Sequence, residues 1–353
     1  LETDVASVAA KYFKWWDVYT EWRNASQMPG DEALLHKREV RQKMLDESEG
    51  LLGALKLPND VSSCTLAADA DFQNAGCSHG ESDKHMYWLR KAGMIKEDPS
   101  TSSAYLVGPP AALQYSLQNL FSRRLAEFSI NVSAPYFVRG AIIDGVNVSK
   151  ESFPCIASSA NKNTDLYLTG RGLPSLVALL VKKSVSSQTE KWPVRLQSHG
   201  AAYSVPLPNN STLSLNNISQ CTKAVLLSLC RSEEEEYLEY LLLIKLLQEI
   251  LAQELCLKIA SSALPAYSLM HFESAATSVM TEARIEIARV CTVGSYISRR
   301  LSILFDSELG TVDFVRMTFA EVNLTRVVAA IVEEHLMKES VPEDIRQLLK
   351  RTP

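Results

Sequence analysis

The sequence contains none of the short motifs that usually mark a catalytic or metal site. Its 353 residues include no GxSxG turn, no Walker-type phosphate loop and no HExxH pair. The seven cysteines form no CxxC pair and the six histidines are dispersed, so no zinc-binding spacing is present. The sequence therefore predicts neither a metal nor a cofactor. Any chemistry must come from residues that the fold brings together.

Two further deficits restrict the class of protein. No apolar run approaches the ~18 residues that span a bilayer. Lys and Arg number 36 against 41 Asp and Glu, and the net charge is −5, whereas proteins that rely on phosphate contacts usually carry a basic excess. The composition is that of a globular chain, and scattered cysteines in odd number predict reduced thiols. Seven N-x-[ST] sequons leave a secreted glycoprotein as the alternative.

The first part of the chain predicts a helical hairpin. Apolar residues recur at helical spacing over residues 5–26 and again over about 32–55, and a Met-Pro-Gly-Asp turn separates the two stretches. The domain boundaries follow from this pattern: an antiparallel hairpin over residues 1–58, a Ser-, Asp- and Gly-rich linker over 59–82, and a core domain over 83–353.

The second helix of this hairpin carries a small basic cluster. Its members are Lys37, Arg38, Arg41 and Lys43. They could contact RNA. The alternative is an ordinary solvated helical face, because nearby acidic residues almost cancel the charge.

The rest of the chain alternates irregularly between helical and strand patterns. Strands are predicted near residues 104–107, 131–138, 165–168, 193–205, 221–230, 283–290 and 311–319, and helices over 111–128, 237–255 and 323–337. The helix over 237–255 is apolar nearly all round and is expected to be well buried. This pattern predicts an α+β fold, with an antiparallel sheet backed by helices.

One stretch, residues 283–305, carries a family resemblance. It begins as a strand and ends as a helix. Glu286-Ile287 and Arg299-Arg300-Leu301 stand at the spacing found in seryl-tRNA synthetases, although the polar residues between them differ. The resemblance implies a class II aminoacyl-tRNA synthetase-like antiparallel sheet flanked by helices, with the N-terminal hairpin as a degenerate tRNA-binding arm.

The resemblance also assigns the positions of the catalytic groups. Gly172 stands where active members carry the Glu that holds the serine ammonium, and Arg171 beside it would repel that group. Ser204 and Pro206 stand where the second motif carries an Arg for the ATP α-phosphate and a Glu for adenine, and Val225 replaces a further acidic residue. Losing one such group usually costs about 3–4 kcal/mol of transition-state stabilisation. The resemblance therefore implies that no seryl-adenylate forms.

Four charged residues of the family motifs remain in this chain. They are Glu286, Arg299, Arg300 and Arg326. With the neighbouring sites lost, they are expected to form structural ion pairs rather than to bind a ligand, because charges on a buried sheet face must be paired.

The helix after Pro109-Pro110 and the proline-containing strand beyond it resemble the family's first motif, which forms the dimer interface. Proline suits an edge strand because it cannot donate to a ladder. The predicted interface residues are Leu113, Leu117, Leu120, Phe121, Pro135 and Tyr136. The alternative is that the apolar stripe faces this domain's own sheet.

The whole combination resembles the seryl-tRNA synthetase-like insect mitochondrial proteins, a family of catalytically degenerate paralogues. That resemblance implies an inactive structural or regulatory subunit of the mitochondrial matrix. Its partner would be the mitochondrial seryl-tRNA synthetase, whose stability or tRNA serylation it would support, with tRNA or DNA as further contacts within the complex. The alternatives are a nucleic-acid-binding or protein-quality-control adaptor and a residual ligase.

Overall fold

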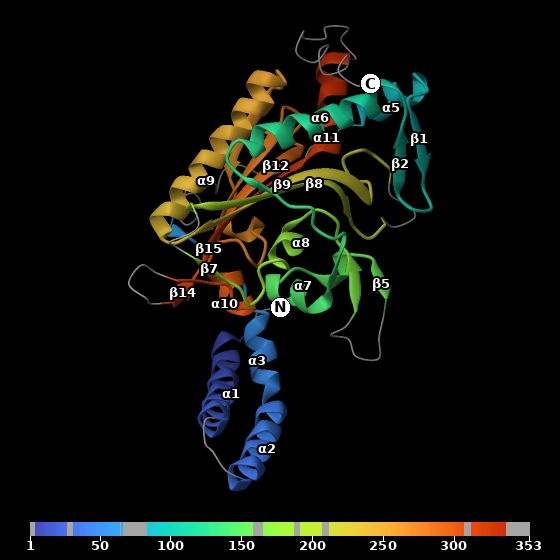
Figure 1. Cartoon of the computed structure of the whole chain (residues 1–353). Coiled ribbons are helices and arrows are strands. Elements are labelled where there is room, and N and C mark those ends of the chain that lie inside the picture. The colour runs from blue at the N-terminus through green and yellow to red at the C-terminus, as the bar shows by residue number, and fades with distance from the viewer. Residues whose placement is uncertain are drawn as a thin grey trace. The chain divides into compact units, whose positions relative to one another are not determined.

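The chain divides into two compact units, Leu1–Pro58 and Asn59–Pro353. The computed structural model describes residues 4–26, 31–63, 65, 83–157, 165–186, 191–206, 212–306 and 312–336, and Figure 1 shows their helices and strands. Most of the predicted linker over 59–82 lies outside the described residues. Within the described ranges, no helix is long and apolar enough to cross a membrane.

The first unit is a helical hairpin whose second arm is broken. Helix α1 (Val5–Ser26) packs against α2 (Asp31–Asp46) and α3 (Ser48–Leu55). A single predicted helix over residues 32–55 is therefore two helices, interrupted at Glu47. A Cβ at Gly50 would collide with the Lys11 carbonyl, so only glycine permits this close approach.

The second unit is built on a seven-stranded sheet. Across the sheet the strands are β10 (Ile259–Ala263), β11 (Ala275–Thr281), β12 (Glu286–Gly294), β15 (Arg316–Asn323), β9 (Gln220–Cys230), β8 (Val194–Tyr203) and β3 (Ile130–Asn131). Neighbouring strands are antiparallel, except for β3, which pairs parallel with β8 at the sheet edge.

Helices cover both faces of this sheet (Figure 1). One face packs against α6 (Pro109–Ala126), α9 (Glu233–Gln248) and α11 (Leu324–Ile331). The other face packs against short helices: α7 (Gly140–Val146), α8 (Leu173–Val177) and α10 (Tyr296–Leu301). The alternation along β9 shows both cores, because Ala224 and Leu226 join the first and Val225, Leu227 and Leu229 the second.

Smaller elements complete the core unit. They are α5 (Lys84–Lys91), the hairpin of β1 (Ile95–Asp98) and β2 (Ser103–Leu106), the sheet of β4 (Phe137–Arg139), β6 (Leu166–Leu168) and β5 (Cys155–Ala157), the sheet of β14 (Val312–Phe314), β13 (Leu304–Asp306) and β7 (Ser184–Ser186), short 3₁₀ turns at Lys150–Ser152 and Ala266–Ser268, and π-helical ends at Glu249–Glu254 and Val332–Leu336.

The expected fold class is confirmed, with differences in detail. The strand predicted over 311–319 is interrupted at Val315, which is buried and donates its amide to Ile303. The strand predicted from residue 283 begins at Glu286. The expectation that the helix from residue 237 is well buried holds for one face, whereas another face, described below, is exposed.

The apolar stripe of α6 requires a correction. Leu113, Leu117 and Phe121 are fully buried and Leu120 nearly so, all within this chain's own core. They pack against the sheet and α11, which is the alternative orientation of the stripe. These four residues therefore present no surface to a second chain.

Candidate functional site

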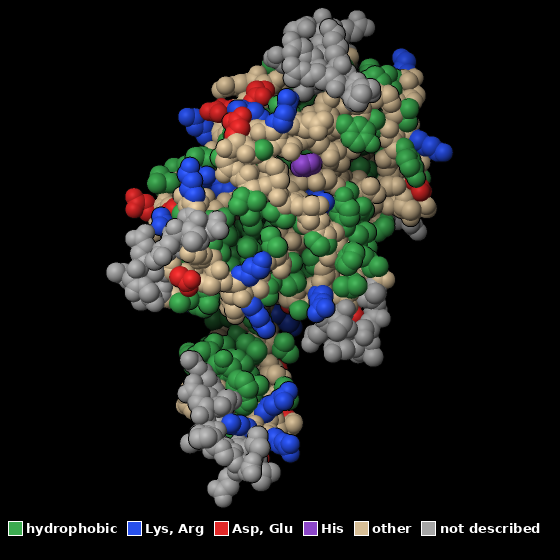
Figure 2. Space-filling view, viewed as in Figure 1, with side chains coloured by type: hydrophobic (Ala, Val, Ile, Leu, Met, Phe, Trp, Pro, Cys, Tyr) green, Lys and Arg blue, Asp and Glu red, His purple; other side chains and the backbone are tan. Residues whose placement is uncertain are grey.

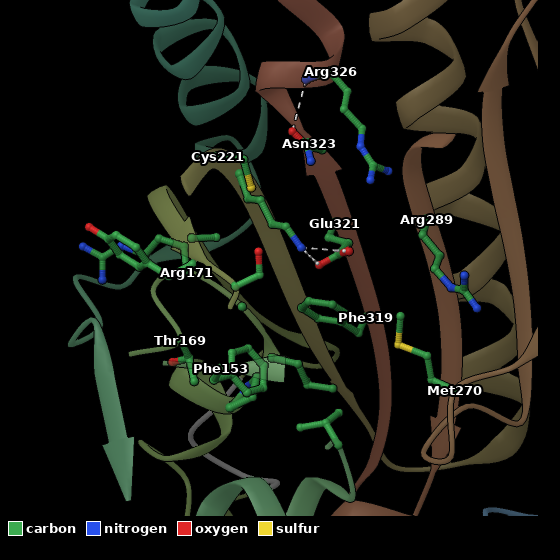
Figure 3. Close-up of a pocket in the computed structure, with 18 of the residues that line it drawn as sticks. Phe153, Thr169, Arg171, Cys221, Met270, Arg289, Phe319, Glu321, Asn323 and Arg326 are labelled. Carbon is green, nitrogen blue, oxygen red and sulfur yellow. Dashed lines mark hydrogen bonds and ion pairs between the residues drawn. The ribbon is translucent and has the colours of Figure 1, made fainter. Parts of the chain in front are cut away.

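A pocket of about 460 Å³ opens on the face of the sheet opposite α6. Strands β9, β15 and β12 form its floor, the start of α11 closes one end, and the segment from Thr169 to Pro174 forms a wall (Figure 3). Phe153, Phe319 and Met270 supply apolar lining. A concave, mostly apolar site with a few polar groups is the usual form of a small-molecule site.

The period of the strands explains which side chains line the pocket. Cys221 and Lys223 on β9, and Phe319, Glu321 and Asn323 on β15, are alternate residues that share one face. Glu321 lies diagonally across the strand pair from Lys223. The sheet thus brings a cation and a carboxylate together inside the pocket.

The first charge pair of the pocket is Lys223 with Glu321. The Lys223 ammonium donates to both Glu321 oxygens, at 3.1 and 3.0 Å (Figure 3). Burial disfavours the charge on each group, but their mutual attraction outweighs it, so the pKa of Lys223 is raised and the pKa of Glu321 is lowered. Each therefore stabilises the charged form of the other.

The second charge pair is Arg289 with Glu273. The guanidinium donates through Nε and Nη2 to the two carboxylate oxygens at 2.8 and 2.6 Å, and it lies 3.4 Å from Glu286. The Glu273 side chain is almost fully buried. Burial raises the pKa of Glu273, and Arg289 opposes that shift. A bidentate pair of this kind is among the stronger charge-assisted contacts.

Arg326 has a different environment at the start of α11. Its Nε donates to the carbonyl of Asn216 at 2.9 Å and its Nη1 to the carbonyl of Glu286 at 2.8 Å. Its backbone amide donates to Asn323, which caps the helix. Arg326 thus links α11 to β12 and to the loop before β9.

Arg299 and Arg300 lie on α10, away from this pocket. Arg299 donates to the Ser295 hydroxyl at 2.8 Å and lies over the Phe314 ring. Arg300 donates to the Tyr296 hydroxyl at 2.6 Å and lies over the ring of the same residue. The structure therefore brings Glu286 and Arg326 to one place and the two α10 arginines to another.

The positions expected to replace catalytic groups are also divided. Gly172 and Ser204 line the pocket. Val225 instead packs in the hydrophobic core on the same side of the sheet. Pro206 is not among the described residues that line the pocket.

Arg171 lies beside the replaced position 172. Its Nε donates to the His199 carbonyl at 3.2 Å, and its guanidinium lies 4.5 Å from the centre of the Tyr136 ring. In Figure 3 the Arg171 side chain extends away from Glu321 and Phe319. Arg171 nevertheless belongs to the lining of the pocket, beside Gly172, and its repulsion of an ammonium group stays a prediction.

No pattern in the sequence pointed to Glu273 as a residue of this site. It lies between a 3₁₀ turn and β11, and its partner is sixteen residues away on another strand. Glu321 lies two residues beyond the strand predicted over 311–319 and continues its alternation from Phe319, so an extension of that strand would have found it. Burial raises the pKa of the Cys221 thiol, which makes it a poor nucleophile at neutral pH.

The predicted RNA-contact residues lie together on α2 in the first unit. Arg38, Arg41 and Lys43 are exposed and Lys37 is half-buried. Among the described residues, no group of three or more His, Cys, Asp or Glu could hold a metal ion.

No family model matches this sequence, and no curated protein matches it. The seven-stranded sheet, its helical layers and the pocket define a class II aminoacyl-tRNA synthetase fold. Within that class, the chain is similar in structure to seryl-tRNA synthetases over 98% of its length.

The cytoplasmic serine-tRNA ligase of Naegleria fowleri, in complex with AMP, has a TM-score of 0.76 at 15% identity, covering 98% of this chain and 90% of that one. The seryl-tRNA synthetase of Pyrococcus horikoshii, complexed with ATP, has a TM-score of 0.70 at 16% identity, with the same coverage of both chains. Prolyl-tRNA synthetase of Giardia lamblia, in complex with prolyl-adenylate, has a TM-score of 0.62 at 12% identity, covering 72% of this chain and 53% of that one. The likeness at these identities is one of fold.

Proposed function

We propose that this chain is a catalytically inactive seryl-tRNA synthetase paralogue that acts as a structural or regulatory subunit. Its partner is the mitochondrial seryl-tRNA synthetase and its location is the mitochondrial matrix. The observation that carries the loss of catalysis is that two of the four cations lining the pocket are paired with carboxylates of this chain. Lys223 is held by Glu321, and Arg289 by Glu273.

An adenylation site needs cations free to meet phosphates and developing negative charge. Structures similar to this one hold AMP, ATP or prolyl-adenylate. Here Glu321 points into the pocket, and its charge would oppose a phosphate. The neutral residues Gly172 and Ser204 line the same pocket. Removing even one preorganised group of this kind usually costs about 3–4 kcal/mol, a rate factor in the hundreds.

The test of inactivity is pyrophosphate exchange with serine and ATP. We expect no exchange above the background of a blank, while an active seryl-tRNA synthetase run in parallel exchanges normally. The Arg326→Met variant is the matched control, because a genuine residual activity would disappear in it and a contaminant's would not. Exchange that is present in the wild type and lost in Arg326→Met would end the proposal.

The subunit role is supported by exposed apolar side chains of residues 130–137, a segment that runs from the β3 edge of the sheet to the start of β4. Ile130, Tyr136 and Phe137 are each about half exposed, and Pro135 lies among them. Figure 2 shows hydrophobic side chains gathered across the middle of one face of the core unit. Apolar patches of this kind commonly mark an interaction surface.

Co-expression with the mitochondrial seryl-tRNA synthetase of the same organism tests the partnership. We expect a complex, and we expect Tyr136→Asp to weaken it by about 2 kcal/mol or more, as a buried aromatic anchor would. Tyr267→Asp, at an exposed position elsewhere, is the control and should leave the complex intact. Two independent species from the wild-type pair would contradict the heterodimer.

A further inference from the structure

The outward face of α9 carries an apolar patch that is exposed in this chain. Tyr237, Leu238, Leu241 and Leu242 are 47%, 59%, 45% and 44% exposed. They stand at positions i, i+1, i+4 and i+5, so they are neighbours on adjoining turns of the helix. The opposite face of α9 packs in the core, and Figure 1 shows the helix along the outer side of the sheet. We call these four residues the α9 patch.

Two exposed charges of opposite sign flank the α9 patch. Glu234 precedes it by about one turn, and Lys245 follows it by about one turn. The Lys245 side chain is 79% exposed and has only a long contact, 3.9 Å, with Glu249. The midpoint of the patch falls between residues 239 and 240, and both charges lie about 8 Å from it along the axis, at 1.5 Å per residue.

We propose that the α9 patch pairs with α9 of a second copy of this chain, antiparallel about a two-fold axis through the middle of the patch. The axis places Tyr237 opposite Leu242 and Leu238 opposite Leu241. It also places Glu234 opposite Lys245, twice, because an isologous contact repeats every pair. Like charges would meet if the helices were parallel, so charge complementarity selects the antiparallel pairing.

The inferred contact is independent of the proposed subunit role, because it uses neither the pocket nor the β3 edge. It is also small. Stable interfaces bury about 1,200–2,000 Å², and one helix face supplies less than this. The association is therefore a reversible one that depends on protein concentration. The other occupant to distinguish is a basic amphipathic helix of a different protein, which would use Glu234 but would be repelled by Lys245.

Sedimentation velocity of the full chain over rising concentration is the experiment. We expect the wild type to shift from monomer toward dimer, and Leu238→Asp to remain monomeric. Glu234→Lys places two lysine pairs in the contact, and Lys245→Glu places two glutamate pairs. Each should raise the dissociation constant roughly tenfold or more, because like charges across an interface are strongly unfavourable.

The decisive sample is an equimolar mixture of the two single variants. In the mixed dimer each charge again meets its opposite, so association should return toward the wild-type level although each variant alone associates more weakly. The double variant Glu234→Lys/Lys245→Glu should associate like the wild type. Lys96→Glu, on exposed β1, is the matched control and should change nothing. Repeating the series with Tyr136→Asp separates any association through the β3 edge.

A wild type that remains monomeric throughout would overturn the proposal. So would single charge variants that associate normally, or a mixture that stays monomeric. If the α9 variants instead weaken binding to the seryl-tRNA synthetase partner while the chain alone is monomeric, the face belongs to that partner and the second-copy pairing is wrong. Unchanged circular dichroism confirms that the variants fold.

Discussion

Replacing Leu117 by Ala should destabilise the isolated chain by about 2–5 kcal/mol, the usual range for a buried leucine. The side chain is fully buried in the core shared by α6, the sheet and α11. Truncation removes its apolar contacts and leaves a cavity that a packed sheet closes only in part. A leucine at a subunit boundary would behave differently, because the isolated chain would lose little.

Urea unfolding of the isolated chain, followed by circular dichroism, measures this effect. The midpoint should fall while the slope with denaturant is unchanged, since the surface exposed on unfolding is nearly the same. Tyr115→Ala is the matched control, because Tyr115 lies on the same helix but is 61% exposed. It should change stability by no more than about 0.5 kcal/mol.

The opposite pattern would refute the reasoning. If Leu117→Ala unfolds at the wild-type midpoint but weakens a complex, the stripe faces a partner and the packing of α6 described above is wrong. Equal loss in both variants would also contradict it, since an exposed tyrosine and a buried leucine should not have equal effects.

Three further changes test the pocket and the unit boundary. Arg289→Met leaves the Glu273 carboxylate buried without its cation and should cost about 3–5 kcal/mol in urea unfolding, whereas Glu273→Gln in the same background should recover part of that loss. Because Lys223 holds the pKa of Glu321 low, Glu321 contributes stability above its ordinary pKa of about 4.3, and this is lost as the pH falls through the lower folded pKa. Stability measured against pH should therefore fall less steeply below about pH 4 in Glu321→Gln, and an identical acid limb would contradict the pairing. A chain beginning at Asn59 should fold cooperatively, because the Asn59 side chain donates to two core carbonyls at 2.9 and 2.8 Å; a near-UV circular dichroism spectrum without fine structure would show otherwise.

Local patterns in the sequence predicted most of the elements. The helix over residues 5–26 has the same bounds in the structure. Helix α6 begins at Pro109, where a proline is preorganised for the first turn. The alternation on β8 and β9 also placed both strands within one or two residues. These predictions depend on residues that are neighbours in sequence, which is why periodicity and capping residues are sufficient for them.

Partners distant in sequence were not predictable in the same way. The four glutamates at the start of α9 form the kind of acidic first turn that the helix dipole favours by itself. One of them, Glu236, is buried, accepts from the Gly294 amide at 2.7 Å and binds Arg316 at 2.7 Å. Burial raises the pKa of Glu236. Its cation is eighty residues further along the chain, so no local pattern could identify it.

The exposure of one face of α9 was not predicted, for a related reason. An all-round apolar pattern states that a helix could be buried on every side, but not that the chain supplies enough structure to bury it. In the described part of the chain, one layer of helices covers that face of the sheet (Figure 1). Leu243 therefore faces the core while Leu242 beside it is left half exposed.

The charge pairs of the pocket separate the residues that hold the fold from those that would hold a substrate. Lys223 and Glu321 come from adjacent strands of one sheet, so the sheet carries both charges without an external anion. Removing either would leave its partner unpaired in a partly buried site, a loss felt by the fold itself. Gly172 and Ser204 instead lie at the pocket wall, outside both charge pairs. Changes at such wall positions can remove substrate contacts while the paired strands beneath keep the architecture.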